Sequence, residues 1–421
     1  MNQYKPYRSF PRRLVRHIVR FLLVSALLLG PSLVFYGQWT YPDQTLPTID
    51  ANKDNRAVAS GLQQNFSNDV LAALRGSREK AGLPSMSAAI AFDGNLQWAA
   101  ATGFANIENN EYATVRSRYR TGSVAKPLTA VALLRLVDAG KIELNKTISN
   151  YLTGLPVALQ PLTANQLGSH RAGVRHYSRI PQWWMGWHEN YSTHEYPNVA
   201  DGLAMFVDDD LRFEPGAGFQ YSTFGYSLLA RIMEGASGKS FTALLDESVF
   251  RPSGMMDTAV DISMLMTGRV AFYEAGNGRY TPSYPINSSY KIAGGGLVST
   301  PSDLVRVGTA LLGDDFVSAE AKKSLFTPLA LANGSMNPEN YAIGWRIDTS
   351  LRLLGEKHPT QIFHHGGTQQ GAAAFLMLLP EYGISIAVMS NSGTGAARAE
   401  VQETAYALAR HVVELKKSRQ K

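Results

Sequence analysis

The sequence predicts an α+β fold in which an antiparallel sheet flanked by helices is built from both ends of the chain. Apolar strand patterns joined by tight turns occur over residues 87–101 and again over 373–389, and a helical pattern closes the chain. Between them, about residues 145–285 show helical patches broken by Gly/Pro loops. This middle part is therefore expected to be an inserted, mostly α-helical region.

The N-terminus carries the signals of a membrane segment. Residues 1–20 hold six basic side chains and no acidic one, and an uncharged apolar run covers residues 21–36. As a helix the run spans roughly 24 Å at about 1.5 Å per residue. Arg20 at one end, and Trp39 and Tyr41 at the other, can extend it across the roughly 30 Å hydrocarbon core of a bilayer.

We interpret residues 21–41 as a transmembrane signal anchor, because no A-x-A-like cleavage site follows the apolar run. A cleaved signal peptide, with export of the remaining chain, is the alternative. In both cases the positive-inside rule places everything after about residue 40 outside the cytoplasm. We therefore expect a single-pass protein of the inner (cytoplasmic) membrane, with residues 1–20 in the cytoplasm and the folded domain in the periplasm.

The net charge comes from the same segment. The 421 residues carry a formal charge of +6, but the chain after residue 20 holds 34 basic and 34 acidic side chains. A neutral body lacks the basic face that nucleic-acid binding needs, so no nucleic-acid partner is expected. The chain has no cysteine, which excludes a disulfide framework, a catalytic thiol and any thiolate metal site.

The first elements after the membrane segment follow from local patterns. Residues 42–65, rich in Pro, Asn and Asp, are expected to tether the domain to the membrane, and a helix is predicted over 68–80. Strands 87–92 and 96–101 form a β-hairpin, because Asp93-Gly94 supplies the positive φ angles of a tight turn.

The later elements follow in the same way. Residues 126–139 carry apolar side chains at helical spacing, and Gly140 is a typical C-terminal stop. The chain then ends on strands 373–379 and 384–389, a helix over about 397–417, and a basic tail at 416–421. These boundaries define one domain over about residues 66–415.

Ser123 and Lys126 are the candidate catalytic pair. No Gly-x-Ser-x-Gly motif occurs, which excludes the nucleophile-elbow hydrolases. Ser-x-x-Lys occurs four times, and the pair at 123 and 126 stands apart because it begins the most strongly predicted helix. Positions three apart share a helix face, so the Lys126 amine can approach the Ser123 hydroxyl. The helix N-terminus adds free N–H groups for developing negative charge.

Around this pair the chain resembles the serine β-lactamase and penicillin-binding hydrolase family, of the class C β-lactamase and D-alanyl-D-alanine carboxypeptidase type. The family signatures S-x-x-K, Y-x-N and K-T-G or H-x-G are matched in order by Ser123-Val-Ala-Lys126, Tyr221-Ser222-Thr223 and His365-Gly366-Gly367. The likeness covers about residues 66–415. Supporting matches to the family occur at 167–173, 254–258 and 293–304. Within the family the chain resembles the mitochondrial serine β-lactamase-like protein and its bacterial relatives, which share the patterns at 221–226 and 287–296.

The resemblance implies acyl transfer through a covalent serine ester. Ser123 would attack a carbonyl carbon while Lys126 and Tyr221 pass its proton to the leaving group. His365 would line the site beside Tyr221, and the backbone N–H groups of Ser123 and Thr368 would form the oxyanion hole. The resemblance implies no cofactor and no metal.

Thr223, Gly366 and Gly367 are the substrate-binding residues that the resemblance implies. Thr223 departs from the family pattern, which has an Asn whose amide helps to hold the acylamido group of the substrate. A Thr hydroxyl can donate or accept a hydrogen bond but reaches less far. The replacement leaves the Ser-Lys-Tyr chemistry intact and argues against efficient β-lactam turnover.

Two other features have ordinary explanations. The chain holds His170, His176, His188, His194 and Glu195, but their spacing puts no pair on one helical face, so no metal site is expected. His364 is assigned to structure. The segment containing Trp183, Trp184 and Trp187 is expected to pack in the core, with an aromatic lid over the site or a wedge facing the membrane as alternatives.

The sequence therefore predicts a membrane-anchored, extracytoplasmic serine hydrolase that acts on an amide or ester bond, with peptides preferred. A promiscuous esterase or a weak β-lactamase is the alternative within the enzymes. A non-catalytic scaffold of the same fold, binding peptidoglycan, a peptide or a membrane partner, is the alternative outside them. The presence of Ser123, Lys126 and Tyr221 together weighs against the scaffold.

Overall fold

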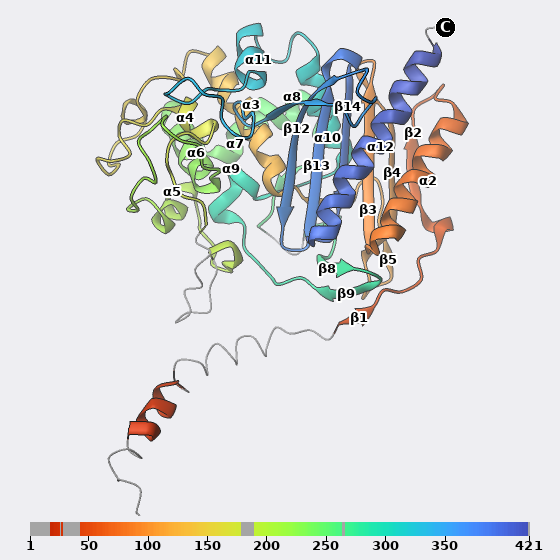
Figure 1. The fold of residues 1–421 in the computed structure, drawn as a ribbon, viewed down its shortest axis with the longest axis horizontal. Coiled ribbons are helices and arrows are strands. Elements are labelled where there is room, and N and C mark those ends of the chain that lie inside the picture. The colour runs from red at the N-terminus through yellow and green to blue at the C-terminus, as the bar shows by residue number, and fades with distance from the viewer. Residues whose placement is uncertain (1–16, 26, 28–42, 178–188, 263–265, 420–421) are drawn as a thin grey trace, which may run out of the picture.

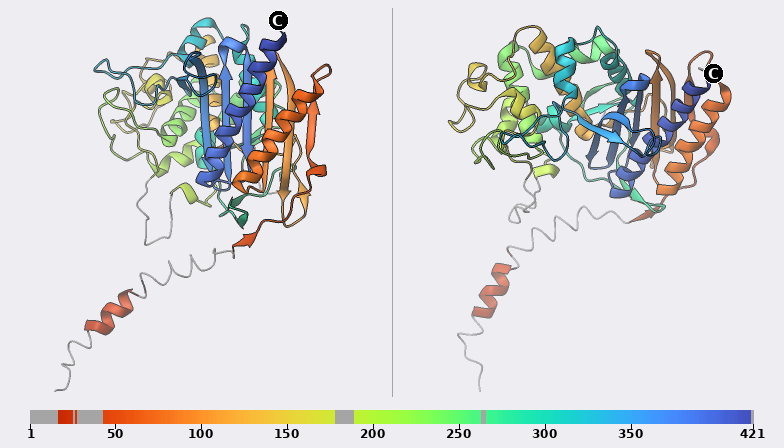
Figure 2. Two further views of the ribbon diagram at one scale, coloured as in Figure 1. Left: turned by 45° about the vertical axis from the view of Figure 1, so that its right-hand side comes forward. Right: turned by 45° about the horizontal axis from the view of Figure 1, so that its top comes forward.

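The computed structural model describes residues 17–25, 27, 43–177, 189–262 and 266–419. Its centre is an antiparallel sheet with the strand order β11-β12-β13-β14-β3-β4-β2, to which β5 adds by pairing with β4. Two short three-stranded sheets, β1-β9-β8 and β6-β10-β7, lie beside it. Helices α2 and α12 lie side by side over one face of the central sheet, and most other helices lie beyond its opposite face (Figures 1 and 2).

The strands are β1 (Gln44–Thr45), β2 (Asn55–Val58), β3 (Ser85–Phe92), β4 (Asn95–Asn106), β5 (Glu111–Tyr112), β6 (Tyr119–Arg120), β7 (Ala259–Val260), β8 (Tyr273–Gly276), β9 (Arg279–Pro282), β10 (Leu297–Ser299), β11 (Arg346–Ser350), β12 (Thr360–Gln369), β13 (Ala372–Leu379) and β14 (Ile384–Ser390). The α-helices are α2 (Gln64–Ala81), α3 (Ala125–Asp138), α4 (Ala164–Gly168), α5 (Val199–Gly202), α6 (Thr223–Ser237), α7 (Phe241–Leu245), α8 (Arg251–Ser253), α9 (Ile292–Gly295), α10 (Pro301–Leu312), α11 (Ala319–Phe326) and α12 (Gly395–Arg419). Two 3-10 turns border the site: η2 (Gly122–Val124) and η7 (Ser289–Lys291).

The two ends of the chain meet in the middle of the sheet. β14 lies between β13 and β3, and Ile90 of β3 is the register partner of Ile386 of β14. The predicted α+β fold, with an antiparallel sheet built from both ends and flanked by helices, is confirmed. The predicted hairpin is also present, and Asp93 and Gly94 at its turn have φ angles of 53° and 77°.

The core lies on both faces of the sheet, because successive side chains of a strand point to opposite sides. Ile90 and Phe92 belong to the cluster that the sheet forms with α2 and α12, whereas Ala89 belongs to the larger cluster on the other face. On this second face, small residues let α10 pack closely against the sheet. A Cβ atom on Gly308 of α10 would lie 2.2 Å from the Ser385 hydroxyl of β14.

Two parts of the chain differ from the sequence-based expectation. Residues 42–65, predicted as a tether, contribute β1 and β2, and β2 pairs with β4 at the edge of the central sheet. β2 is short, mostly exposed and partly polar, as edge strands often are. Its sequence therefore lacks the alternation of apolar and polar side chains by which a strand is predicted. β11 and β12 were not predicted, because the two glycines of β12 have low strand propensity.

The N-terminal part described is a short helix over residues 17–25. Within the described ranges, none of the helices has the length and apolar character needed to cross a bilayer. Most of the anchor predicted over residues 21–41 falls at 26 and 28–42, outside the described residues, and so does the segment containing Trp183, Trp184 and Trp187.

Candidate active site

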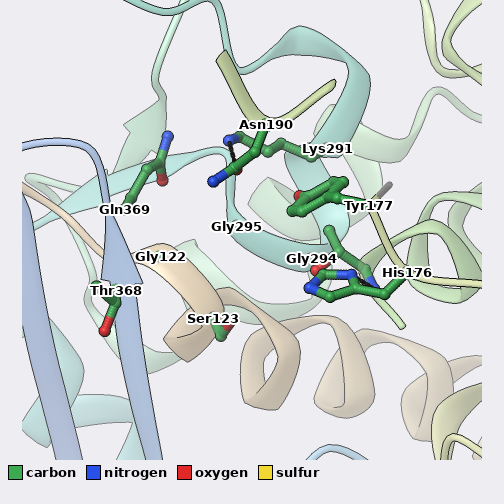
Figure 3. Close-up of a pocket in the computed structure, with 11 residues that line it drawn as sticks. Gly122, Ser123, His176, Tyr177, Asn190, Lys291, Gly294, Gly295, Thr368 and Gln369 are labelled. Carbon is green, nitrogen blue, oxygen red and sulfur yellow. Dashed lines mark hydrogen bonds between the residues drawn. The ribbon is translucent and has the colours of Figure 1, made fainter. Parts of the chain in front are cut away.

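Ser123 lies in a tight turn at the entrance of a buried helix. The chain leaves β6, makes the 3-10 turn η2 over Gly122–Val124, and continues directly into α3. Ser123 is half-buried and faces a pocket of about 120 Å³, on whose other sides Thr368, Gln369 and Lys291 lie (Figure 3). The predicted position at a helix start is therefore correct, except that the serine sits in the preceding 3-10 turn.

Lys126 is completely buried next to this serine. Its Nζ lies 3.2 Å from Ser123 Oγ, 3.1 Å from Thr223 Oγ1 and 2.7 Å from the Gly294 carbonyl oxygen. Burial, followed by the positive charge of Arg346, holds the pKa of Lys126 well below that of an exposed lysine. A neutral amine keeps a lone pair that can accept the Ser123 proton, so this lysine suits a general base.

Tyr221 lies two residues before the start of α6 and packs against Lys126. The Lys126 Nζ atom is 4.7 Å from the centroid of the Tyr221 ring. Burial raises the pKa of Tyr221 above that of a free phenol, although Arg346 and the nearby Ser123 hydroxyl oppose this shift. The phenol therefore stays protonated at neutral pH and can relay a proton without serving as the primary base.

His170 supports Tyr221 and was not among the predicted site residues. Its ring centroid lies 4.3 Å from that of Tyr221 and 4.6 Å from that of Tyr341, and its Nδ1 accepts a hydrogen bond of 3.1 Å from the Ser222 N–H. Its φ of 63° is unusual for a residue other than glycine. A positive φ angle of this kind often accompanies functional sites, and the ring of His170 packs against that of Tyr221.

His365 lies on β12 behind Tyr221, with the two ring centroids 6.2 Å apart. Its Nδ1 lies 2.7 Å from the Gly366 carbonyl, which can only accept, so Nδ1 carries the hydrogen. Nε2 then accepts from Tyr341 Oη at 3.0 Å and from Arg346 Nη1 at 3.3 Å. Burial and nearby cations lower the pKa of His365, which keeps the ring neutral.

These contacts indicate that His365 positions other groups. In the part of the chain that the structure describes, no hydrogen bond joins it to Ser123, Lys126 or Tyr221. Its catalytic role stays a prediction. His364 faces away from it and pairs with Asp348 at 2.7 Å, in keeping with the structural role expected for it.

Two glycines bring β12 against the turn that carries Ser123. A Cβ atom on Gly122, whose φ is 47°, would lie 2.7 Å from Thr368 N. A Cβ atom on Gly367 would lie 2.0 Å from the Thr121 carbonyl oxygen and 3.0 Å from Ser123 N. The backbone nitrogens of the predicted oxyanion pair therefore belong to two closely packed segments. Such fixed N–H donors can stabilise an oxyanion.

Arg346 is the second residue that the sequence did not reveal. It lies on β11, pairs with Glu339, and places its guanidinium 5.3 Å from the ring centroid of Tyr221. From there its charge lowers the pKa values of both Lys126 and Tyr221. No motif marks this arginine, because its place in the site depends on the pairing of β11 with β12.

Comparisons with known proteins agree with this arrangement. The human mitochondrial serine β-lactamase-like protein LACTB is 25% identical over 415 residues, covering 80% of this chain and 75% of that protein. Penicillin-binding protein 4* of Bacillus subtilis (strain 168) is 28% identical over 314 residues, covering 71% and 66%. The crystal structure of D-amino acid amidase from Ochrobactrum anthropi SV3, complexed with L-phenylalanine amide, matches with a TM-score of 0.67 and 21% identity, covering 85% and 100%.

The extent of the family match decides the assignment. The sequence profile of the Beta-lactamase family matches residues 70–411, which include the central sheet from β3 to β14 and the serine–lysine pair. The D-alanyl-D-alanine-carboxypeptidase/endopeptidase AmpH of Escherichia coli (strain K12), 29% identical over 234 residues and covering 54% and 58%, is also a relative, so the likeness is to the class C and D-alanyl-D-alanine carboxypeptidase type. A match over most of the chain, on the fold and motifs described above, shows that the chain belongs to the β-lactamase family.

Proposed function

We propose that the chain is a serine hydrolase that cleaves an amide or ester bond, with peptides preferred, through an acyl-enzyme on Ser123. The observation that carries this proposal is the buried amine of Lys126, 3.2 Å from the Ser123 hydroxyl and with a lowered pKa. A lysine held neutral beside a serine has the chemistry of a base–nucleophile pair.

Acylation starts when Lys126 takes the Ser123 proton and Ser123 Oγ bonds to the substrate carbonyl carbon. The carbonyl oxygen becomes an oxyanion between the N–H groups of Ser123 and Thr368. When the intermediate collapses, the bond from carbon to the leaving nitrogen or oxygen breaks. The leaving group keeps the electron pair and takes up the proton, which passes from Lys126 through the Tyr221 hydroxyl.

Deacylation repeats these steps with water as the nucleophile. Lys126 accepts a proton from the water, the hydroxide oxygen bonds to the acyl carbon, and the bond from that carbon to Ser123 Oγ breaks. Ser123 Oγ recovers the proton and the carboxylic acid product leaves. Each group returns to its starting protonation state, so no cofactor is needed for the cycle.

The surroundings of Thr223 argue against efficient β-lactam hydrolysis. Its side chain is 3% exposed, and its hydroxyl lies 3.1 Å from Lys126 Nζ. A hydroxyl engaged in this way is poorly placed to hold the acylamido group of a β-lactam. A promiscuous esterase or a weak β-lactamase remains the second candidate within the same chemistry.

Labelling with a fluorophosphonate tests the nucleophile. We expect intact mass to show one phosphonyl group on the natural protein and none on Ser123→Ala, because only a deprotonated serine attacks this reagent quickly. Rates with D-Ala-D-Ala peptides, L-peptides, short esters and a chromogenic cephalosporin then identify the bond class. Equal labelling of both proteins would exclude Ser123 as the nucleophile and favour the non-catalytic scaffold, and a dominant cephalosporin rate would make the chain a β-lactamase.

We also propose that the enzyme is anchored in the inner membrane by residues 21–41 with its domain in the periplasm, or is exported after cleavage of that segment. The acid-free basic start and the apolar run after it support this location. We expect the full chain to stay in the membrane fraction after a high-salt wash. Recovery of a soluble, N-terminally trimmed form would instead identify a cleaved signal peptide.

A further inference from the structure

Lys291 is a buried lysine that lines the pocket, and the proposed acylation chemistry does not use it. It is the last residue of η7, directly before α9, and is 2% exposed. Figure 3 shows its amine next to Asn190 on the side of the pocket opposite Ser123. The Lys291 amine and the Ser123 hydroxyl therefore lie on different sides of the same pocket.

The Lys291 ammonium has fewer partners than it can bind. An ammonium carries three N–H donors. Among the described residues its one hydrogen-bond acceptor is Asn190 Oδ1, at 3.2 Å, and its other close neighbours are the rings of Tyr290 and Tyr177, at 5.1 Å and 5.7 Å from Nζ to the centroids. Buried charges are normally paired, so an amine with two spare donors facing a pocket indicates a missing anionic or carbonyl partner.

The charged groups around Lys291 do not provide that partner. Asp261 is held by Arg120 at 2.6 Å and by Arg269 at 2.8 Å. The nearby Glu274 carboxylate also acts on Arg120, and it accepts a hydrogen bond of 2.8 Å from the Gly371 N–H. Among the described residues neither carboxylate forms an ion pair with Lys291.

The protonation of Lys291 is consequently sensitive to what occupies the pocket. Burial and the charge of Arg120 lower the pKa of Lys291 to about 7, against the opposing effect of Asp261. Lys291 in turn contributes to the lowered pKa of Lys126. An anion bound at Lys291 would favour its ammonium form, because opposite charges at short distance raise the pKa of a base.

Gln369 adds a second unpaired group on the same side. Its Nε2 donates to Ser288 Oγ at 2.7 Å, whereas its Oε1 is buried and has no partner among the described residues. A buried acceptor without a donor costs free energy unless a ligand supplies one. The pocket thus offers both a cation and a free acceptor.

The direction of β12 shows which part of a substrate reaches these groups. Tyr221, which would protonate the leaving group, lies beside His365, and Gln369 lies four residues further along the same strand. Four residues of a strand span roughly 13 Å. The leaving group therefore departs at the His365 end, and the acyl part of the substrate extends past Ser123 toward Gln369 and Lys291.

Resting on the proposed function, we propose that Lys291 and Asn190 form a subsite that selects acyl groups carrying a carboxylate a few atoms from the scissile carbonyl. The carboxylate accepts hydrogen bonds from the Lys291 amine, and an N–H group of a peptide-like acyl chain can donate to Gln369 Oε1. The pocket of about 120 Å³ is lined by both Ser123 and Lys291, so a short acyl chain bonded to the serine can reach the amine. The substrate class is thus an acidic acyl donor.

Two 4-nitrophenyl esters with the same leaving group test this subsite: the monoester of adipic acid, which is anionic, and that of adipamic acid, its neutral isostere. We expect the natural enzyme to have a kcat/KM at least tenfold higher for the adipate. Lys291→Met should remove this preference while Ser123 still reacts with a fluorophosphonate. The matched control Lys141→Met, at an exposed position, should keep the preference.

The pH dependence gives a readout without any substitution. A lysine binds an anion only when protonated, so the preference for adipate should be largest near pH 6 and fall as the pH rises through about 7. An equal ratio of the two esters in the natural enzyme and in Lys291→Met, or a ratio that does not change with pH, would overturn the subsite. Loss of all ester hydrolysis and of Ser123 labelling in the natural protein would instead refute the proposed function, and the subsite with it.

Discussion

Replacing Lys126 with methionine is expected to slow the acylation of Ser123 about a thousandfold, within the range typical of general acid–base catalysis. Methionine keeps most of the side-chain volume and removes the amine that lies 3.2 Å from the serine hydroxyl. The protein should stay folded, because a buried amine contributes little to stability compared with an apolar side chain of similar size. The measurement is the rate of fluorophosphonate labelling, with the thermal unfolding midpoint as the check on folding.

The pH profile of that rate distinguishes a base from a merely structural lysine. In the natural protein the rate should rise as the pH passes the lowered pKa of Lys126, since only the neutral amine accepts a proton. Lys126→Met should not show this rise. If the variant were labelled as fast as the natural protein, or with the same pH profile, the base would have to be sought elsewhere.

The second large effect is expected from a single added methyl group on β12. In Gly367→Ala the new Cβ would lie 2.0 Å from the Thr121 carbonyl oxygen and 3.0 Å from Ser123 N, so strand and turn must separate. Overpacking of this kind costs about 1–3 kcal/mol of the free energy of unfolding. Losing the alignment of an oxyanion donor lowers kcat by about 100-fold or more.

Gly366 provides the matched control one residue earlier on the same strand. The nearest atom to a Cβ at this position is Phe375 Cδ2 at 3.6 Å, which is an ordinary contact. We therefore expect Gly366→Ala to keep the natural free energy of unfolding, measured by urea unfolding. Equal losses of stability in the two variants would show that the close contact at Gly367 does not hold β12 against the Ser123 turn.

Local patterns were sufficient for much of the fold. The hairpin around Asp93-Gly94 and the helix following Ser123 depend on turn chemistry and helical spacing, which are local properties. β2 and β12 were missed for a different reason. β2 is polar because it is an edge strand, and β12 contains glycines because its backbone has to approach the Ser123 turn. The residue types of both strands are therefore explained by contacts that form only in the folded chain, which local sequence patterns do not reveal.

The candidate site was predicted only where motifs mark it. Ser123, Lys126 and Tyr221 lie together as the ordered motifs implied. Arg346 gave no such signal, because its importance comes from burial and from a neighbour more than 50 residues away in the chain. Lys291 ends one of the four Ser-x-x-Lys matches and lies in the stretch 287–296 that resembles the family. Neither pattern indicated that its amine would be buried beside Asn190 in the pocket.

The central position of β14 has a consequence for synthesis of the protein. Phe92 of β3 pairs with Ile384 of β14, about 290 residues later. At roughly 5–20 residues per second on the ribosome, the first hairpin waits on the order of 15–60 s for the strand that completes its sheet. Ser123 emerges early in that interval and Thr368 near its end. The nascent chain therefore carries the nucleophile long before it can form the oxyanion hole, and becomes competent only after β12 has been made.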